Sequence, residues 1–168
     1  MDFDSTLFET SASRKLRAVK GSKKDWDAIY ACIPQFRLYD GWKEVLKHMQ
    51  EGGISLAIVS AAKAELIEKT LTHFGIECDA IVGYQRYIKK PSPRLMEMAL
   101  KKLNLRPDEV IYIGDGKEDE ELSRNSGVRF FGALWDSADR DYLVSCASTL
   151  SRPEEILFAT NKFHLSPT

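Results

Sequence analysis

Two aspartates at the start of the chain, Asp2 and Asp4, are separated by one residue in the segment Asp2-Phe3-Asp4-Ser5-Thr6-Leu7. On extended backbone, side chains two positions apart point to the same side, so the two carboxylates can share one site. One can attack phosphorus while the other transfers the proton of the leaving group, as covalent phosphoryl transfer requires. The same spacing also occurs on solvated acidic turns, so this motif needs support from elsewhere in the chain.

Two polar residues that could hold a phosphoryl group lie further along the chain. Ser60 directly follows the apolar run Ile54 to Val59, at the carboxyl end of a predicted strand, where open α/β sheets bind ligands. Lys90 precedes Pro91 at the start of a predicted helix, and its ammonium can offset the charge of carboxylates and phosphate. Ser60 is also suited to cap the next helix, Lys90 could instead be solvated, and Lys89 is a competing candidate.

Another predicted strand, Val110 to Ile113, is followed by Gly114-Asp115-Gly116, and Asp119 lies one helical turn beyond Asp115. Oxygen ligands from Asp2, Asp115 and the backbone carbonyl of Asp4, completed by water, make the octahedral set that Mg²⁺ prefers. We therefore expect Mg²⁺ as the cofactor. The alternative is an acidic helix start favoured by the helix dipole, which is our interpretation of the neighbouring Glu118, Glu120 and Glu121.

The elements that must position these residues alternate, from residue 54 onward, between short apolar runs and amphipathic stretches. The predicted strands are Ile54 to Val59, Ala80 to Tyr84, Val110 to Ile113 and Val128 to Leu134. The predicted helices are Ala62 to Phe74, one starting at Ser92-Pro93, one from Asp115 to Gly127, and a short one around Pro153 to Phe158 in a less regular tail. The pattern predicts a single α/β domain over residues 1–168: a three-layer α/β/α, Rossmann-like fold with a parallel sheet.

The stretch before residue 54 is less sheet-like and resembles an insertion. It predicts short helices at Ser11 to Lys20 and Asp25 to Cys32, followed by a clearer helix at Gly41 to Glu51.

Composition excludes several classes of protein. The net charge of -1 over 168 residues disfavours a uniformly basic nucleic-acid binder, and the 43% hydrophobic content is ordinary for a soluble domain. No apolar run approaches the ~20 residues of a membrane span and no signal segment opens the chain, so we expect a cytoplasmic protein without a membrane partner. Cys32, Cys78 and Cys146 lack C-x-x-C pairing, which indicates buried thiols rather than disulfides or a zinc site.

Taken in order, four segments resemble the motifs of the haloacid dehalogenase superfamily: D-x-D-x-T from Asp2, the strand ending in Ser60, Lys90-Pro91, and G-D-x-x-x-D from Gly114. The resemblance spans residues 2 to about 135 and implies a phosphohydrolase. It implies Asp2 as the nucleophile and Asp4 as the general acid/base, supported by Thr6. It implies that the phosphate is bound by Thr6, Ser60 and Lys90. It implies that the metal is bound by Asp2, Asp4, Asp115 and Asp119. The acid at position 4 favours phosphate esters over haloacids, because members that displace halide lack it.

Members of this superfamily carry lid modules, and here only residues 8–40 offer room for one, as a small helical cap of the C1 type. The interval from Ser60 to Lys90 holds just a helix and a strand. Six basic residues lie in this cap: Arg14, Lys15, Arg17, Lys20, Lys23 and Lys24. They favour either a landing surface for a polyanion, such as a nucleotide, a nucleic-acid end or a phosphorylated sugar, or a solvated cationic face.

The chain departs from the superfamily pattern at its start, because an apolar strand precedes the nucleophile in the family whereas Met1 directly precedes Asp2 here. We therefore expect the first strand to be missing or truncated. The function expected is Mg²⁺-dependent hydrolysis of a small-molecule phosphate monoester through an aspartyl-phosphate on Asp2. Two alternatives stay open: a catalytically impaired phosphate-binding or scaffold domain, and a phospho-accepting signalling domain.

Overall fold

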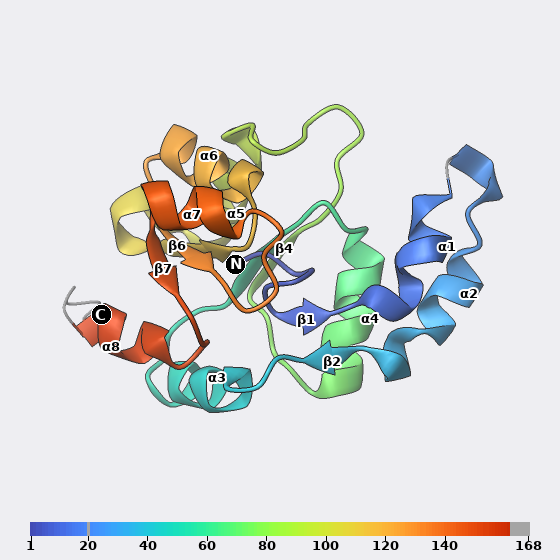
Figure 1. The fold of residues 1–168 in the computed structure, drawn as a ribbon, viewed down its shortest axis with the longest axis horizontal. Helices are drawn as coiled ribbons and strands as arrows, with labels where there is room; N and C mark the ends of the chain where they lie inside the picture. Colours follow the sequence, from blue (N-terminus) through green and yellow to red (C-terminus); the bar gives the residue numbers. More distant parts are fainter. Residues whose placement is uncertain (20, 162–168) are drawn as a thin grey trace.

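Parallel strands form the body of the chain in this computed structural model, which describes residues 1–19 and 21–161. One pair consists of β3 (Ala57–Val59) and β4 (Ala80–Val82). A second group contains β5 (Ile111–Gly114), β6 (Arg129–Ala133) and β7 (Ser148–Leu150), in that spatial order. Helices lie in the connections between successive strands (Figure 1), as parallel strands require.

Helices cover both faces of these strands and bury a separate apolar cluster on each. On one face, α3 (Trp42–Glu51), α4 (Ala64–Phe74) and α8 (Glu155–Asn161) contribute Trp42, Ile67 and Ile156 to a cluster with strand residues such as Ile58 and Ile113. On the other face, α5 (Arg94–Leu103) and α6 (Lys117–Ser126) pack Leu95 and Leu122 against Val59 and Tyr112. The three-layer α/β/α prediction is therefore confirmed.

Helix ends follow the local sequence closely. Gly75 and Gly127, at φ of 66° and 68°, end α4 and α6 in the left-handed conformation that glycine adopts without strain. The helix predicted from Ala62 begins two residues later, because Lys63 has extended backbone, with φ of -60° and ψ of 133°, and serves as its N-cap. In the tail, α7 (Arg140–Cys146) and β7 were not predicted. β7 contains a single apolar residue, Leu150, whereas β3 and β4, of the same length, are wholly apolar.

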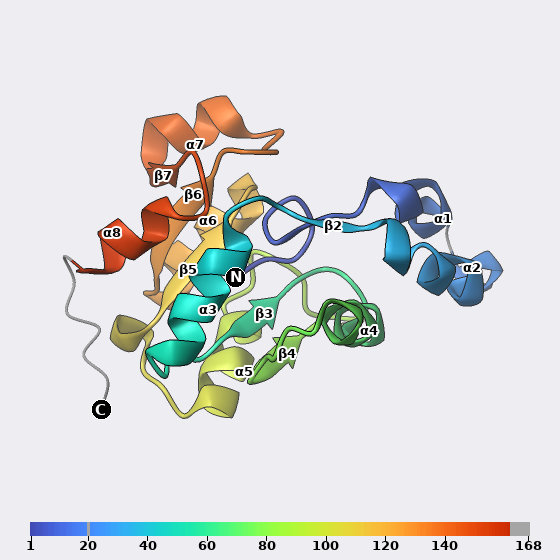
Figure 2. The ribbon, with the colours of Figure 1, turned by 90° about the horizontal axis from the view of Figure 1, so that it is seen from below.

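The first two residues lie between β3 and β5 (Figure 2). The Asp2 amide donates to Ile113 O at 2.8 Å, the Val59 amide donates to Met1 O at 2.9 Å, and the Met1 ammonium lies 2.6 Å from Ala57 O. Beside Met1, a largely apolar groove of about 520 Å³ runs along both strands and is lined by α3 and α5 as well. Met1 and Asp2 thus lie where the first strand of the sheet was expected, beside this groove.

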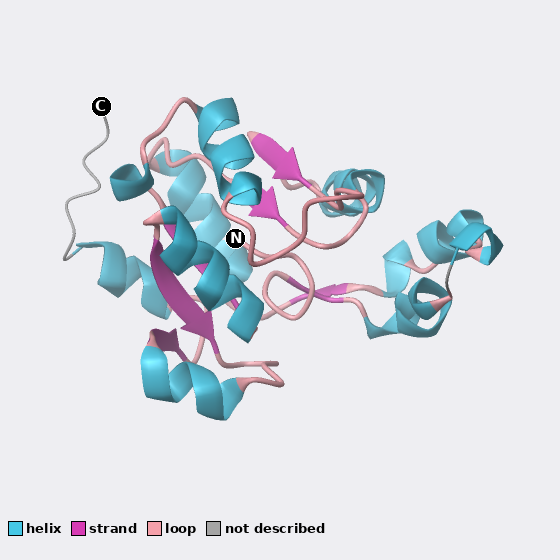
Figure 3. Cartoon of the chain, turned by 90° about the horizontal axis from the view of Figure 1, so that it is seen from above, coloured by secondary structure: helices cyan, strands magenta, loops and turns pink. Residues whose placement is uncertain are grey.

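A helical segment projects from one end of the body between two short antiparallel strands, β1 (Phe8–Glu9) and β2 (Arg37–Leu38) (Figure 3). It contains α1 (Arg14–Ala18), α2 (Trp26–Ala31) and three 3₁₀ turns at Ser11–Ser13, Gly21–Lys23 and Ile33–Gln35. Its small core of Ile29, Ile33 and Phe36 packs on Leu66 of α4, which fixes the segment to the body.

The structure bears on two expectations drawn from composition, the absence of a membrane span and the burial of the cysteine thiols. None of the helices among the described residues is long and apolar enough to cross a membrane. Cys32 and Cys78 are half-buried rather than fully buried, because one follows the end of α2 and the other lies in the loop before β4. The Cys146 side chain is outside the described set.

Candidate active site

A buried ion-pair network joins Asp2, Lys90 and Asp119, which come from three distant parts of the chain. Lys90 Nζ donates to Asp2 Oδ1 at 2.7 Å and to Asp119 Oδ1 at 2.6 Å. All three side chains are at most 10% exposed. Each follows a strand or strand-like segment of the parallel sheet, so they converge at the carboxyl edge, where such sheets bind ligands.

Asp115 joins the two other aspartates to form an acidic cluster. One carboxylate oxygen from each of Asp2, Asp115 and Asp119 lies within 4.8 Å of the others. Thr6 Oγ1 donates to Asp115 Oδ1 at 2.9 Å, and the Gly116 amide donates to Asp119 Oδ2 at 3.1 Å. These donors orient the carboxylates toward a common point.

Mutual repulsion and burial act on this cluster. Burial, opposed by the nearby Lys90 ammonium, raises the pKa of Asp2 to about 6. Burial, reinforced by the charges of Asp2 and Asp119, raises the pKa of Asp115 to about 7. Three carboxylates facing one ammonium leave two negative charges uncompensated when all are ionised. An all-oxygen donor set with that excess of charge suits a hard divalent cation such as Mg²⁺.

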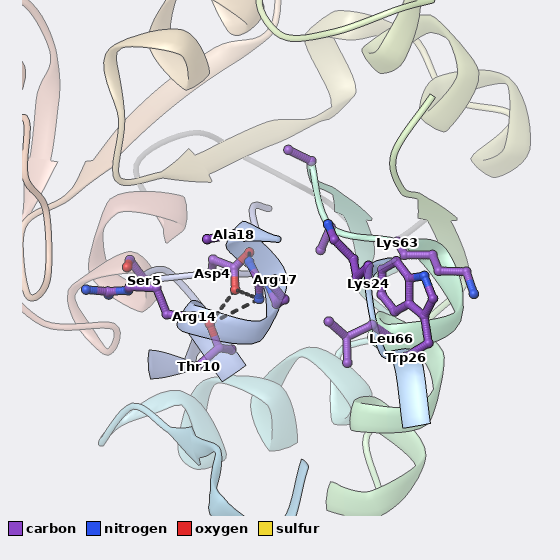
Figure 4. Close-up of a pocket in the computed structure, with 12 residues that line it drawn as sticks. Asp4, Ser5, Thr10, Arg14, Arg17, Ala18, Lys24, Trp26, Lys63 and Leu66 are labelled. Carbon is purple, nitrogen blue, oxygen red and sulfur yellow. Dashed lines mark hydrogen bonds and ion pairs between the residues drawn. The ribbon is translucent and has the colours of Figure 1, made fainter. Parts of the chain in front are cut away.

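The Asp4 carboxylate is not part of the acidic cluster. Arg17 of α1 donates to both of its oxygens, at 2.7 Å to Oδ1 and 2.6 Å to Oδ2, and Thr10 Oγ1 also donates to Oδ1 (Figure 4). A two-pronged pair of this kind is geometrically specific and strong. The Asp4 side chain therefore connects the sheet edge to the projecting helical segment, whereas the Asp2 side chain belongs to the acidic cluster.

The predicted phosphate-binding residues differ in their surroundings. Ser60 is 3% exposed at the end of β3, and its Oγ accepts from the Ala62 amide. Lys90 contacts Asp2 and Asp119, whereas Lys89 is exposed, so the structure distinguishes the two lysines. The Thr6 hydroxyl is occupied by Asp115 rather than by Asp4.

Several residues that hold the site were missed by the sequence reasoning. The indole N–H groups of Trp42 and Trp135 both donate to Thr6 O, at 2.8 and 3.0 Å. The Tyr112 hydroxyl lies 3.0 Å from Asp119 Oδ1 and 2.8 Å from Val59 O. Arg17 was noted only as one member of a basic group. No spacing in the sequence relates a tryptophan at position 135 to a carbonyl at position 6, so these contacts had no local signal.

The comparison with known families matches residues 6–133 to haloacid dehalogenase-like hydrolases. This chain belongs to that family. The motif-based resemblance is thus confirmed at the level of the family, and the matched residues begin at Thr6, just after Asp2 and Asp4.

Known relatives agree with this membership. The chain is 31% identical over 101 residues to phosphoglycolate phosphatase of Vibrio vulnificus, covering 58% of this chain and 44% of that protein. It is 32% identical over 109 residues to pyrophosphatase PpaX of Listeria monocytogenes, covering 63% and 50%. The matched part of this chain therefore spans about half the length of these relatives.

A solved structure supports the fold. A haloacid dehalogenase-like family hydrolase from Streptococcus pneumoniae superposes with a TM-score of 0.73 at 18% identity, covering 95% of each chain. At that identity the likeness concerns the architecture alone.

Proposed function

We propose that this chain hydrolyses phosphate monoesters with Mg²⁺ through a covalent aspartyl-phosphate on Asp2. The observation that carries the proposal is the placement of the Asp2 carboxylate at the sheet edge, paired with Lys90 and within 4.8 Å of the Asp115 and Asp119 oxygens. Family membership and the phosphatase names of the relatives support the same class of reaction.

In the first step, a carboxylate oxygen of Asp2 forms a bond to phosphorus while the bond from phosphorus to the ester oxygen breaks. Asp4 donates a proton to that leaving oxygen. In the second step, Asp4 removes a proton from water, which attacks phosphorus and releases inorganic phosphate and free Asp2. Because Arg17 engages both Asp4 oxygens in this structure, proton transfer requires that this pair opens.

The remaining residues would hold and neutralise the phosphoryl group. Lys90 and Ser60 would donate to its oxygens, and Thr6 would orient Asp115 through their hydrogen bond. Asp2, Asp115 and Asp119, with the Asp4 backbone carbonyl, would hold Mg²⁺. The ion would supply positive charge that favours approach of the phosphate to the carboxylates. We further propose that residues 8–40 serve as the cap of this site, since Arg17 and Thr10 of that segment contact Asp4.

The test is steady-state release of phosphate from p-nitrophenyl phosphate with Mg²⁺. We expect Asp2→Asn to lower kcat by at least ~10³-fold, because it removes the nucleophile. Asp40→Asn, which changes an exposed carboxylate, serves as the matched control and should keep wild-type activity.

Two results would count against the proposal. Full activity of Asp2→Asn would exclude the covalent intermediate on that residue. A single labelling by acetyl phosphate without turnover would instead identify a phospho-accepting signalling domain.

A further inference from the structure

A pocket of about 370 Å³ lies between the projecting helical segment and the loop that follows β3. Asp4 and Ser5 line it on the side of the acidic cluster, and Trp26 and Leu66 line the opposite wall (Figure 4). If Asp4 protonates the leaving oxygen of a phosphate ester, the leaving group must lie on the Asp4 side of phosphorus. This pocket is therefore the space that the leaving group would enter.

Positive charge dominates the lining of this pocket. Its basic residues are Arg14, Arg17, Lys24 and Lys63, and its only acid is Asp4. Arg17 is paired with Asp4, and Lys63 with Glu65. Arg14 and Lys24 have no ion pair with any residue that the structure describes. Lys24 thus faces the pocket without a carboxylate partner among the described residues, and Arg14 does so beside Glu9, whose carboxylate already pairs with Arg37.

The rest of the lining is suited to a small carbon skeleton. Ala18, Ala62 and Leu66 contribute apolar surface, and the Trp26 ring lies under the Lys63 and Lys24 ammonium groups, 4.5 and 5.4 Å from its centroid. Cation–π contacts hold those ammonium groups near the wall. The pocket combines an apolar wall with fixed positive charge, which favours an anion carried on a short carbon stem.

We propose, building on the phosphatase function above, that the substrate is a phosphate monoester whose leaving group bears a second anionic group, recognised in this pocket by Arg14 and Lys24. The second group is a carboxylate or another phosphate, since both present oxygens to guanidinium and ammonium donors. A second anion near Arg17 would also offer that guanidinium an alternative partner to Asp4, which leaves the Asp4 carboxylate available for proton transfer.

The six basic residues of the cap segment provide matched controls. Arg14, Arg17 and Lys24 line the pocket, whereas Lys15 and Lys23 of the same segment do not, and Lys20 lies outside the described residues. Arg14→Ala/Lys24→Ala and Lys15→Ala/Lys23→Ala therefore remove the same charge from the same segment. A pocket-specific effect appears in the first pair alone, whereas general electrostatic attraction changes both.

The experiment compares esters that differ only in the second anion: phosphoglycolate with ethyl phosphate, and propane-1,3-diol bisphosphate with propyl phosphate. The measured quantity is the ratio of kcat/KM within each pair, with Mg²⁺. We expect wild type to prefer, in at least one pair, the ester that carries the second anionic group by about tenfold or more. The pair with the larger ratio identifies carboxylate or phosphate as the second group. Arg14→Ala/Lys24→Ala should lower that ratio about tenfold, and Lys15→Ala/Lys23→Ala should leave it within about twofold.

The outcomes separate this inference from the proposed function. Turnover of all esters with ratios near one, or an equal loss in both double variants, overturns the inference and leaves the phosphatase function standing. If no ester is turned over, the phosphatase function fails. Calorimetric binding of phosphoglycolate and of propane-1,3-diol bisphosphate to wild type and both double variants then decides the pocket: binding weakened only by Arg14→Ala/Lys24→Ala supports it, and any other result overturns it. Far-UV circular dichroism and the thermal midpoint confirm that each variant is folded.

Discussion

At the scale of single residues, the acidic cluster depends on Lys90. Among the described residues, Lys90 is the cation that pairs with both Asp2 and Asp119. All three side chains are almost fully buried. Removing one member of a buried ion pair leaves its partner charged without compensation, which costs more than the pair itself contributes. Position 90 therefore serves the stability of the site as well as its proposed chemistry.

We expect Lys90→Ala to lower stability by about 3–5 kcal/mol at pH 7.5 without metal, a fall in Tm on the order of 10 °C. The fall should be smaller near pH 5, below the pKa of about 6 that burial gives Asp2. Thermal unfolding followed by circular dichroism measures both. The exposed neighbour Lys89→Ala is the control and should shift Tm by less than ~2 °C. Equal shifts in the two variants would show that the buried network contributes no stability.

The same cluster predicts how stability depends on pH and Mg²⁺. Burial and neighbouring charge raise the pKa values of Asp2 and Asp115 to about 6 and about 7, so these two carboxyl groups hold more protons in the folded chain than in the unfolded one between pH ~4 and ~7. Their contribution to stability without metal therefore falls as pH rises through that window, while the Met1 amino group, with its pKa lowered to about 5, acts in the opposite sense above pH 5. Protons also compete with the metal, so Mg²⁺ should bind more tightly above it.

We expect Mg²⁺ at about a hundredfold excess over its dissociation constant at pH 8 to raise Tm by ~5–10 °C. The same concentration near pH 5.5 should raise it by less than half as much. Scanning calorimetry with and without EDTA tests this, and Asp119→Asn should reduce the shift at pH 8. A shift of equal size at both pH values would mean that these carboxylates do not bind the ion.

At the scale of elements, the groove between β3 and β5 determines how firmly Asp2 is held. Met1 and Asp2 make parallel-sheet hydrogen bonds to Ala57, Val59 and Ile113, and the Met1 ammonium occupies a place that suits an amide N–H. Its burial lowers the pKa of this amino group to about 5. A strand flanked by β3 and β5, with α3 and α5 on its two faces, would be apolar along its whole length.

Extending the chain before Met1 by five apolar, β-branched residues should therefore fill the groove and raise Tm by ~5 °C or more, because burial of their side chains outweighs the cost of ordering them. A Gly-Ser extension of equal length is the control and should have little effect. Thermal unfolding of the three proteins decides the matter. If both extensions act alike, the groove does not accept a strand.

At the scale of the whole molecule, the described chain divides its proposed tasks between two regions. The acidic cluster and Lys90 lie on the sheet body, whereas Arg14, Arg17 and Lys24 lie on the segment between β1 and β2. The two regions meet at Asp4 and through the packing of Ile29, Ile33 and Phe36 on Leu66. Metal binding should therefore be separable from the recognition of the leaving group.

Replacing residues 11–35 by a short Gly-rich turn should leave a folded body, since β1 and β2 are antiparallel neighbours that a turn can join. We expect a lower Tm, because Leu66 becomes exposed, but an undiminished rise in Tm on addition of Mg²⁺. Calorimetry with and without Mg²⁺ tests this. Loss of the Mg²⁺ effect in a folded protein would show that the segment helps to form the metal site.

The sequence by itself determined the order of the elements and the residues that follow their ends. Apolar runs and glycine stops are local signals, so β3 to β6 and the end of α4 at Gly75 were predictable within a few residues. Because parallel strands share one carboxyl edge, Asp2 and Asp115 were also predictable as neighbours. β7 and α7 were not predicted, since β7 has one apolar residue and the apolar residues Tyr142, Leu143 and Val144 of α7 are consecutive rather than at helical spacing.

Only the tertiary structure decided which of these side chains touch. Lys90 reaches Asp2 across 88 residues of sequence, Arg17 occupies Asp4, and Trp42 and Trp135 converge on Thr6 O. Such pairings depend on how layers pack and on which donor lies nearest to each buried acceptor. These pairings follow from the three-dimensional arrangement of residues that are distant in the chain, and spacing along the sequence does not predict them.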